Sequence, residues 1–328
     1  MRRLVPFFPL VLIFLVSCQP VEVRSMVKET PAAALLPVKT TSGTSTVPGM
    51  PVDPPRPGKV ETDITYCSPD GLPQQMDLYY PPETIRPPWP VVVYIHGGSW
   101  QQGDKETAFY MPSFLELQAR GFFIVAINYR LAPVHPFPAQ IEDARCAIRF
   151  LRANASKYHI QSNHIGTIGD SAGGHLAALL GLAGTNQDWD SAEFADQSPD
   201  VQAVVSLYGI SDLTRVFEND GTQIWPRVFG VIEKTDPRLN SASPLSYVHR
   251  NAPPFLLIHG NLDHIVPFEQ SQWLFDALRN TGNSVDLIEV HNADHAFVQV
   301  GENPIDPEIS SLDRSVVEFF VQTLLRGQ

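Results

Sequence analysis

The hydrophobic positions of this chain follow two different periods. Short and nearly continuous apolar runs, such as residues 91–95 (Val-Val-Val-Tyr-Ile), are typical of strands that are buried on both faces. Longer segments place apolar residues every three or four positions, as residues 138–158 do, and this spacing predicts helices. The predicted strands are residues 60–66, 74–80, 91–95, 122–127, 165–168, 201–207, 255–258 and 285–290, and the predicted helices are residues 108–119, 138–158, 171–182, 268–280 and 307–325.

This order of elements predicts an α/β fold. Strands that alternate with helices are joined by right-handed crossovers, which give a mostly parallel central sheet with helices on both faces. Residues 209–253 interrupt the alternation, because they hold only two short helical fragments (212–218 and 225–231) between polar and proline-containing stretches. We interpret residues 209–253 as a small cap-like insertion. In such a sheet ligands bind at the carboxyl ends of the strands, so the functional site is expected there.

The N-terminal segment does not belong to the predicted fold. Residues 1–17 place Arg2 and Arg3 before an apolar stretch that is too short to span a membrane, which is typical of a secretory signal peptide. The segment runs into Leu-Val-Ser-Cys at residues 15–18, which resembles the bacterial lipobox, in which the cysteine is lipidated. The alternative is an ordinary signal peptide with a chance cysteine.

A tether follows the signal segment. Residues 18–59 are rich in Pro, Thr and Ser and are predicted to be disordered, so the folded domain should comprise residues 60–328. We therefore expect an exported domain that is anchored to a bacterial membrane through a lipid on Cys18. The residue after Cys18 is Gln19 and not Asp. In lipoproteins of Gram-negative bacteria, this resembles the pattern that is sent on to the outer membrane.

Net charge and motif content exclude some partners. The chain has a formal net charge of −12 and no cluster of Lys or Arg, whereas binding of nucleic-acid phosphates needs a basic surface. No Gly-rich dinucleotide-binding motif follows a predicted strand, and no Cys/His cluster has metal-site spacing, so we expect no cofactor and no metal. The sequence indicates no oligomeric state.

Two cysteines remain once Cys18 is assigned to lipidation. An exported chain could pair Cys67 with Cys146. They fall in different predicted elements, and their spacing fits no metal site. We therefore favour two unpaired, packed cysteines.

The clearest candidate for chemistry is the stretch Gly-Asp-Ser-Ala-Gly at residues 169–173, which has the form G-x-S-x-G. A strand is predicted before it and a helix after it, which is the context in which this motif presents a nucleophilic serine. The turn would expose the Ser171 hydroxyl, and Gly169 and Gly173 would be small because backbone segments approach closely there. The plainer interpretation is a glycine-rich turn with a capping serine.

An acid and a base follow at the ends of later strands. Asp263 lies in the loop after residues 255–258, and His295 lies in the loop after residues 285–290. The chain order of serine, acid and histidine matches the α/β-hydrolase arrangement. The rival acids are Asp286, Glu289 and Asp294, and the rival bases are His264, His291 and His175. His175 follows Ser171 at helical spacing, and we interpret it as a packed helix histidine.

These residues give the chain, from about residue 60 onward, a resemblance to α/β-hydrolase esterases. It is similar to the group that contains feruloyl-esterase-like and hormone-sensitive-lipase-like enzymes. The motifs that carry the resemblance are residues 96–100 (His-Gly-Gly-Ser-Trp) with 103–105 (Gly-Asp-Lys), 128–133 (Asn-Tyr-Arg-Leu-Ala-Pro), 169–175 (Gly-Asp-Ser-Ala-Gly-Gly-His), His259-Gly260 with Asp263, and Asp294-His295. Ser99 stands where hormone-sensitive-lipase-like enzymes have a third glycine, which favours the feruloyl-esterase-like branch.

The resemblance implies the α/β-hydrolase fold and a serine carboxylesterase that works through an acyl-enzyme. Ser171 would be the nucleophile, His295 the base and Asp263 the acid that orients the imidazole. The oxyanion would be bound by fixed backbone N–H groups. The expected donors are Gly97, Gly98 and Ala172.

The expected substrate is a small-molecule ester with a short-chain or aromatic acyl group. The aromatic residues that could line its pocket are Trp100, Tyr208, Trp225 and Phe297, although aromatic residues also fill protein cores. The cap-like insertion is too short for a large lid, which argues against long-chain triglycerides. Two alternatives stay open. One is an amidase of the arylformamidase type on the same triad, and the other is a catalytically silent surface protein that binds a ligand or partner.

Overall fold

The computed structural model describes residues 58–184, 187–216 and 224–326. The predicted signal segment, the predicted lipidation site at Cys18 and the predicted tether up to residue 57 lie outside the described residues, as do residues 217 and 218 of the predicted fragment 212–218. In the part of the chain that is described, no helix is both long and apolar enough to cross a membrane.

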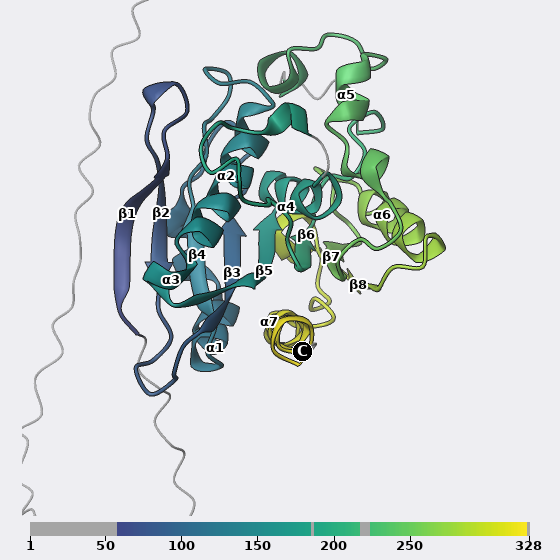
Figure 1. Cartoon of the computed structure of the whole chain (residues 1–328). Helices are drawn as coiled ribbons and strands as arrows, with labels where there is room; N and C mark the ends of the chain where they lie inside the picture. The colour runs from purple at the N-terminus through teal and green to yellow at the C-terminus, as the bar shows by residue number, and fades with distance from the viewer. Residues whose placement is uncertain (1–57, 185–186, 217–223, 327–328) are drawn as a thin grey trace, which may run out of the picture. The chain divides into compact units, whose positions relative to one another are not determined.

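A mostly parallel sheet of eight strands forms the centre of the described fold (Figure 1). Its spatial order is β1-β2-β4-β3-β5-β6-β7-β8. β2 runs antiparallel to both of its neighbours, and all the other pairs are parallel. The strands are β1 (Val60–Cys67), β2 (Gln74–Tyr79), β3 (Trp89–Ile95), β4 (Phe123–Ile127), β5 (Ile160–Asp170), β6 (Ala203–Leu207), β7 (Phe255–Gly260) and β8 (Val285–Val290). The alternation of strands and helices therefore predicted the fold class correctly.

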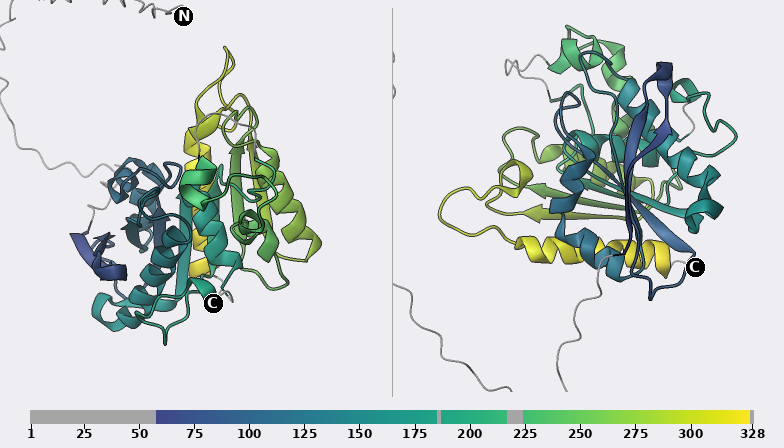
Figure 2. Two further views of the ribbon diagram at one scale, coloured as in Figure 1. Left: turned by 90° about the horizontal axis from the view of Figure 1, so that it is seen from above. Right: turned by 90° about the vertical axis from the view of Figure 1, so that its left-hand side faces the viewer.

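Helices cover both faces of the sheet. On one face lie α1 (Pro112–Ala119) and α7 (Ile309–Phe320), which are next to each other below the sheet in Figure 1 and again in the right-hand view of Figure 2. On the other face lie α2 (Ala139–Ala153), α3 (Ala155–Tyr158), α4 (Ala172–Leu182) and α6 (Glu269–Asn280). In β3, Val91 and Val93 belong to the apolar core under α2 and α4, whereas Val92 and Tyr94 belong to the core under α1 and α7. A strand buried on both faces explains the continuous apolar run.

Several helices begin or end at residues that the periodicity did not indicate. The predicted helix 138–158 is divided at Asn154, whose backbone angles (φ −103°, ψ 16°) leave the helical region. The predicted helix 108–119 begins late, because residues Lys105–Tyr110 form a 3-10 turn and α1 starts at Pro112, a residue suited to the first turn. The cap-like insertion holds the unpredicted α5 (Pro237–Ser241). The other short helical turns are Pro69–Gly71, Gln187–Trp189, Trp225–Phe229, Pro244–Tyr247, His295–Phe297 and Val321–Leu325.

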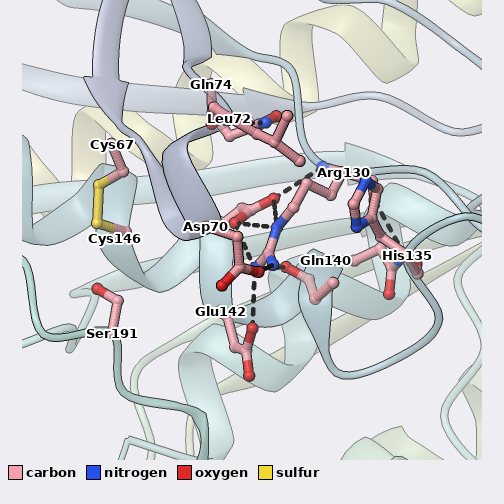
Figure 3. A network of polar contacts seen from close by, with 12 residues as sticks. Cys67, Asp70, Leu72, Gln74, Arg130, His135, Gln140, Glu142, Cys146 and Ser191 are labelled. Atoms are coloured by element: carbon pink, nitrogen blue, oxygen red, sulfur yellow. Dashed lines mark hydrogen bonds and ion pairs between the residues drawn. A yellow bond between two sulfur atoms is a disulfide. The ribbon is translucent and has the colours of Figure 1, made fainter.

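Cys67 and Cys146 are joined by a disulfide, so the expectation of two unpaired cysteines is wrong. Cys67 ends β1 at the edge of the sheet, and Cys146 lies in α2 (Figure 3). Their Cα atoms are 6.4 Å apart, within the span of a disulfide. The contact exists because α2 packs against β1, which the positions of the two residues in the sequence do not indicate.

An ion-pair network around the buried Arg130, near the disulfide, holds the loop after β4 (Figure 3). The Arg130 guanidinium contacts Glu142 at 2.8 Å and Asp143 at 2.9 Å, both in α2, and reaches Asp70 in the β1–β2 turn at 3.4 Å. In the same loop, the Tyr129 hydroxyl donates to the carbonyl of His96 at 2.9 Å. The network thus fixes the segment that supports the loop after β3.

Candidate active site

Ser171 lies in the sharp turn between β5 and α4. Its backbone angles (φ 52°, ψ −114°) are strained for a residue with a side chain, as a serine held out of a strand–helix turn requires. A Cβ atom at Gly169 would collide with the backbone of Gly173, and a Cβ at Gly173 would collide with the carbonyl of Ile95. Both glycines of the motif are therefore dictated by close backbone approach. The turn also places Ser171 at the N-terminus of α4, where the helix dipole favours developing negative charge.

The sheet topology brings the loop after β3 next to this turn. β3 lies between β4 and β5, and Ile95 at its end is in register with Gly169 of β5. From β3 the chain crosses to β4 on one side, whereas from β5 it crosses to β6 on the other side. Such a change of direction leaves a crevice at the carboxyl ends of the two strands. The segment that begins at His96 therefore faces the nucleophile turn.

Three side chains from three loops form one line of hydrogen bonds. His295 Nε2 lies 3.1 Å from Ser171 Oγ, and His295 Nδ1 lies 2.8 Å from Asp263 Oδ2. Because Nδ1 faces a carboxylate, it carries the ring proton, and Nε2 is left to accept from the serine hydroxyl. The structure thus brings together the three residues that the chain order singled out. This geometry can activate a serine for attack on a carbonyl carbon.

The Asp263 carboxylate is firmly held. Its Oδ1 accepts the backbone N–H groups of Ile265 at 2.9 Å and Val266 at 2.8 Å. Its Oδ2, which faces His295, also lies 3.4 Å from Nε2 of the buried His259. Burial raises the pKa of Asp263, but the hydrogen bonds from His259, His295 and Val266 outweigh it and hold the pKa well below its ordinary value. Asp263 is therefore a fixed anion at neutral pH.

His259, which the sequence motifs include beside Asp263 without a role, is a neighbour of the acid. Its Nδ1 lies 2.7 Å from Ser271 Oγ, and its Nε2 lies 2.8 Å from the carbonyl of Val266. The ring therefore packs under the loop that carries Asp263. The signal for this role was present, because His259 lies next to the end of β7, four positions before the acid.

The rival acids lie elsewhere. Asp286 and Glu289 are exposed on β8, and Glu289 lies 3.4 Å from His291. The carboxylate of Asp294 accepts from the ring of His264, with its Oδ2 2.6 Å from Nδ1. Two of the rival bases, His264 and His291, are therefore paired with two of the rival acids.

His175 is a packed histidine, as its helical position suggested. It is fully buried in α4, where its Nε2–H donates to the carbonyl of Ala242 at 2.7 Å and its Nδ1 accepts from the indole N–H of Trp100 at 3.3 Å. Burial lowers the pKa of His175 to about 4. The ring is therefore neutral near pH 7 and holds Trp100 in place through the hydrogen bond from its indole N–H.

One of the three predicted oxyanion donors is wrong. The backbone N–H of Gly97 donates to Oδ1 of Asp170 at 3.1 Å, so its hydrogen is directed away from Ser171. Among the described residues, no acceptor takes the backbone N–H of Gly98, Ser99 or Ala172. Ser99, which has a positive φ of 53°, also lines the cavity next to Ser171 together with Ala172. Sequence reasoning noted Ser99 only as a departure from a glycine and missed its amide.

A small apolar cavity of about 50 Å³ adjoins the nucleophile. Of the four predicted pocket aromatics, Trp100 and Trp225 line it. The other two pack around the base, because the Tyr208 ring lies 4.8 Å from the His295 ring and 5.0 Å from the Phe297 ring. Among the described residues, the cavity is also lined by Ser99, Ser171, Ala172, Ile210, Val216, Ile224, Ile265 and Val266. A larger depression of about 410 Å³ lies at the other end of α4 and contains no member of the Ser171–His295–Asp263 line.

One group of possible metal ligands occurs among the described residues. Cys67, Cys146 and Glu193 have ligand atoms within reach of one another. The two sulfurs are bonded to each other in the disulfide, so neither is a thiolate that could bind a metal.

The chain is similar to known esterases. Its residues 76–278 match the family model described as BD-FAE. Esterase LipC of Mycobacterium tuberculosis is 34% identical over 238 residues, which cover 70% of this chain and 58% of LipC. Two solved structures each have a TM-score of 0.70. One is a truncated carbohydrate esterase from gut microbiota, 25% identical, with 84% of this chain and 99% of that chain covered. The other is a bifunctional GH43-CE of Bacteroides eggerthii, 30% identical, with 80% of this chain and 38% of that chain covered.

Proposed function

The chain belongs to the BD-FAE family, and from this premise we propose that it is a serine carboxylesterase that hydrolyses short-chain carboxylic esters through an acyl-enzyme. The observation that carries the proposal is the line of contacts from Ser171 through His295 to Asp263. A nucleophile, a base and an orienting acid stand there in the order that acyl transfer needs. The esterase LipC and the carbohydrate esterase from gut microbiota, to which the chain is similar, support the same reaction class.

Acylation begins at the Ser171 hydroxyl. His295 Nε2 removes its proton as Oγ attacks the ester carbonyl, and the Asp263 carboxylate stabilises the imidazolium that forms. The tetrahedral intermediate then collapses, His295 returns the proton to the departing alcohol, and the acyl group stays on Ser171. Water, activated by the same imidazole, attacks the acyl-enzyme and releases the acid.

The negative oxygen of the intermediate needs donors that are already in place. We propose the backbone N–H groups of Ala172, Ser99 and Gly98 for this role. Ala172 opens α4 directly after the nucleophile, and Ser99 lines the same cavity. Loss of a single such donor typically slows the reaction about 10²-fold to 10³-fold. Gly97 contributes indirectly, because its bond to Asp170 sets the position of the loop.

The cavity favours short acyl groups over aromatic ones. One water molecule needs a cavity of about 10–15 Å³, so a cavity of about 50 Å³ holds a group of only a few heavy atoms. The walls contributed by Ile210, Val216, Ile224 and Val266 are apolar, which suits the alkyl part of an acetyl to butyryl group. We propose that this cavity receives the acyl group and that the alcohol departs on the side open to solvent. The carbohydrate esterase among the similar structures supports acylated sugars as a source of such esters.

We also propose that the enzyme is exported and held on a membrane by a lipid on Cys18. The lipobox-like residues 15–18 carry this proposal, and the Cys67–Cys146 disulfide supports it, because disulfides persist mainly in oxidising compartments. Mass spectrometry of the N-terminal peptide from the native protein tests it. A diacylglyceryl adduct on Cys18 that is lost in Cys18→Ser agrees with the proposal. An unmodified Cys18 in a secreted protein contradicts it.

A substrate panel tests the reaction class. The purified protein is assayed with p-nitrophenyl acetate, butyrate and octanoate, an acetylated sugar, a feruloyl ester and an N-formyl aromatic amide. We expect hydrolysis of the acetate and butyrate, with at least about a 10⁴-fold loss of kcat in Ser171→Ala. Turnover of the formamide alone would support the amidase alternative. No turnover of any substrate would support the silent binding protein.

A further inference from the structure

The loops after β7 and β8 each carry an Asp-His dipeptide, and the aspartate of each loop binds the histidine of the other loop. Asp263 and His264 are adjacent in the first loop, and Asp294 and His295 are adjacent in the second. Asp263 of the first loop binds the ring of His295 in the second, at 2.8 Å. Asp294 of the second loop binds the ring of His264 in the first, at 2.6 Å. The catalytic contact therefore has a reciprocal contact next to it.

The Asp294 carboxylate accepts hydrogen bonds from three donors in the two loops. Its Oδ1 accepts the backbone N–H of His264 at 3.1 Å and the backbone N–H of His295 at 2.6 Å. The ring Nδ1 of His264 lies 2.7 Å from the same oxygen and 2.6 Å from Oδ2. One carboxylate thus joins the backbone next to the acid with the backbone of the base.

The bond to His295 also sets the conformation of the base. Asp294 is the N-cap of the 3-10 turn His295–Phe297, in which Ala296 has a positive φ of 58°. A cap fixes the first residue of such a turn. Movement of Asp294 would therefore tilt the His295 ring out of line with Ser171. The side chain of Asp294 is 21% exposed and that of His264 is 72% exposed, so the contact lies near the protein surface.

We propose that Asp294 and His264 are a positioning pair, which holds the acid loop and the base loop in the register that lines up Asp263, His295 and Ser171. Neither residue is assigned a contact with the substrate. The inference rests on the proposed esterase function only for its kinetic readout, because the contact itself is a property of the folded protein.

Four variants isolate the pair. His264→Ala removes the ring donor. His264→Asn keeps a donor, since the side-chain amide nitrogen of Asn takes the place of Nδ1. Asp294→Asn keeps one acceptor oxygen and removes the charge. His291→Ala is the matched control, because His291 is also an exposed histidine after β8 whose Nδ1 reaches the other loop, 3.1 Å from Asn261 Nδ2, and lies 3.4 Å from Glu289. Within the described residues it has no contact with Asp294, so it tests whether loss of any link between the two loops has the same effect.

Kinetics with p-nitrophenyl acetate give the first readout. We expect kcat to fall about threefold to tenfold in His264→Ala and Asp294→Asn with KM unchanged, because a hydrogen bond from a mostly exposed ring is moderate in strength. The double variant should fall no further than either single variant, which is the signature of a coupled pair. His264→Asn should recover most of the loss, and His291→Ala should match the wild type.

Proton NMR gives a second readout that does not need turnover. The proton between His295 Nδ1 and Asp263 should give a low-field resonance, assigned by its loss in His295→Ala. We expect this resonance to be sharp in the wild type, His264→Asn and His291→Ala, and broadened in His264→Ala. Melting temperatures show that each variant is folded.

The results that overturn the inference differ from those that overturn the function. Equal kcat in the wild type and His264→Ala, with an unbroadened resonance, would contradict the positioning pair. Equal losses in His264→Ala and His264→Asn would also contradict it, since the donor would then be irrelevant. An inactive wild type would contradict the esterase proposal, and the NMR comparison would still test the pair.

Discussion

The backbone N–H of Gly97 donates to the side chain of Asp170, which lies 73 positions later in the chain and directly before the nucleophile. Asp170 also accepts from the hydroxyl of Tyr94 at 2.8 Å. The second residue of the G-x-S-x-G motif is therefore the anchor of the loop that presents Gly98 and Ser99 to the site. The loop after β3 and the nucleophile turn are positioned as one unit.

Replacing Asp170 by Ala should misplace the oxyanion donors. We expect kcat for p-nitrophenyl acetate to fall about 10²-fold with a small change in KM, because the loop binds the transition state more than the substrate. Asp170→Asn, which keeps an acceptor oxygen for Gly97, should lose less. Steady-state kinetics on variants of verified melting behaviour measure this. A decrease of less than threefold in Asp170→Ala would contradict the anchoring role.

His175 should make stability depend on pH. Its pKa of about 4 in the folded protein lies below the value of about 6.5 for a histidine in the unfolded chain, so the unfolded state binds more protons between these pH values. The free energy of unfolding should therefore fall by about 3 kcal/mol as the pH drops from 6.5 to 4. Urea unfolding at several pH values measures the slope. His175→Gln should have a smaller slope in this window, and an unchanged slope would contradict the assignment.

The disulfide should contribute to stability and leave catalysis intact. Cys67 and Cys146 are 79 positions apart, and a cross-link over a long loop restricts the unfolded chain. The Cys67→Ser/Cys146→Ser double variant should lose about 2–5 kcal/mol of unfolding free energy. Its kcat at a temperature where it is folded should equal that of the wild type. A melting temperature that is insensitive to both the double substitution and reduction would argue against the disulfide.

Trp225 should limit the length of the acyl group. Its indole lines the cavity and stacks on Phe229, with ring centroids 5.6 Å apart. Trp225→Ala opens space for a longer chain, so kcat/KM for the octanoate relative to the acetate should rise about tenfold or more. Trp273→Ala in α6 is the control, since Trp273 does not line the cavity and lies against Arg215. An unchanged chain-length preference in Trp225→Ala would place the acyl group elsewhere.

The parts of the site that could be predicted from the sequence are those that depend on short segments of the chain, namely the apolar runs and the residues directly after them. The apolar runs defined the strands, and the loops at their carboxyl ends held Ser171, Asp263 and His295. A parallel sheet brings such loops to one edge, whatever the lengths of the crossovers between them. For the same reason Asp286 and Glu289, which fall within the last predicted strand, are less suited to the role of the acid than a residue in a loop.

The parts that could not be predicted depend on contacts between distant segments. Which N–H groups remain available for an oxyanion depends on where Asp170 reaches. The Gly97 N–H is taken by Asp170, so its assignment from the sequence was wrong, and Ser99, which we propose as a donor, had no signal in the local pattern. The disulfide depends on how α2 lies against β1. The roles of Tyr208 and Phe297 depend on the direction of their rings, which face His295 and each other and do not line the cavity.

The central claim is that Ser171 is a nucleophile activated by His295. The most direct measurement is reaction of the purified protein with a fluorophosphonate, followed by peptide mass mapping. We predict one covalent adduct, located on Ser171, absent in Ser171→Ala and formed at least about 10³-fold more slowly in His295→Ala. An unlabelled wild-type protein, or an adduct on another residue that persists in Ser171→Ala, would contradict the claim.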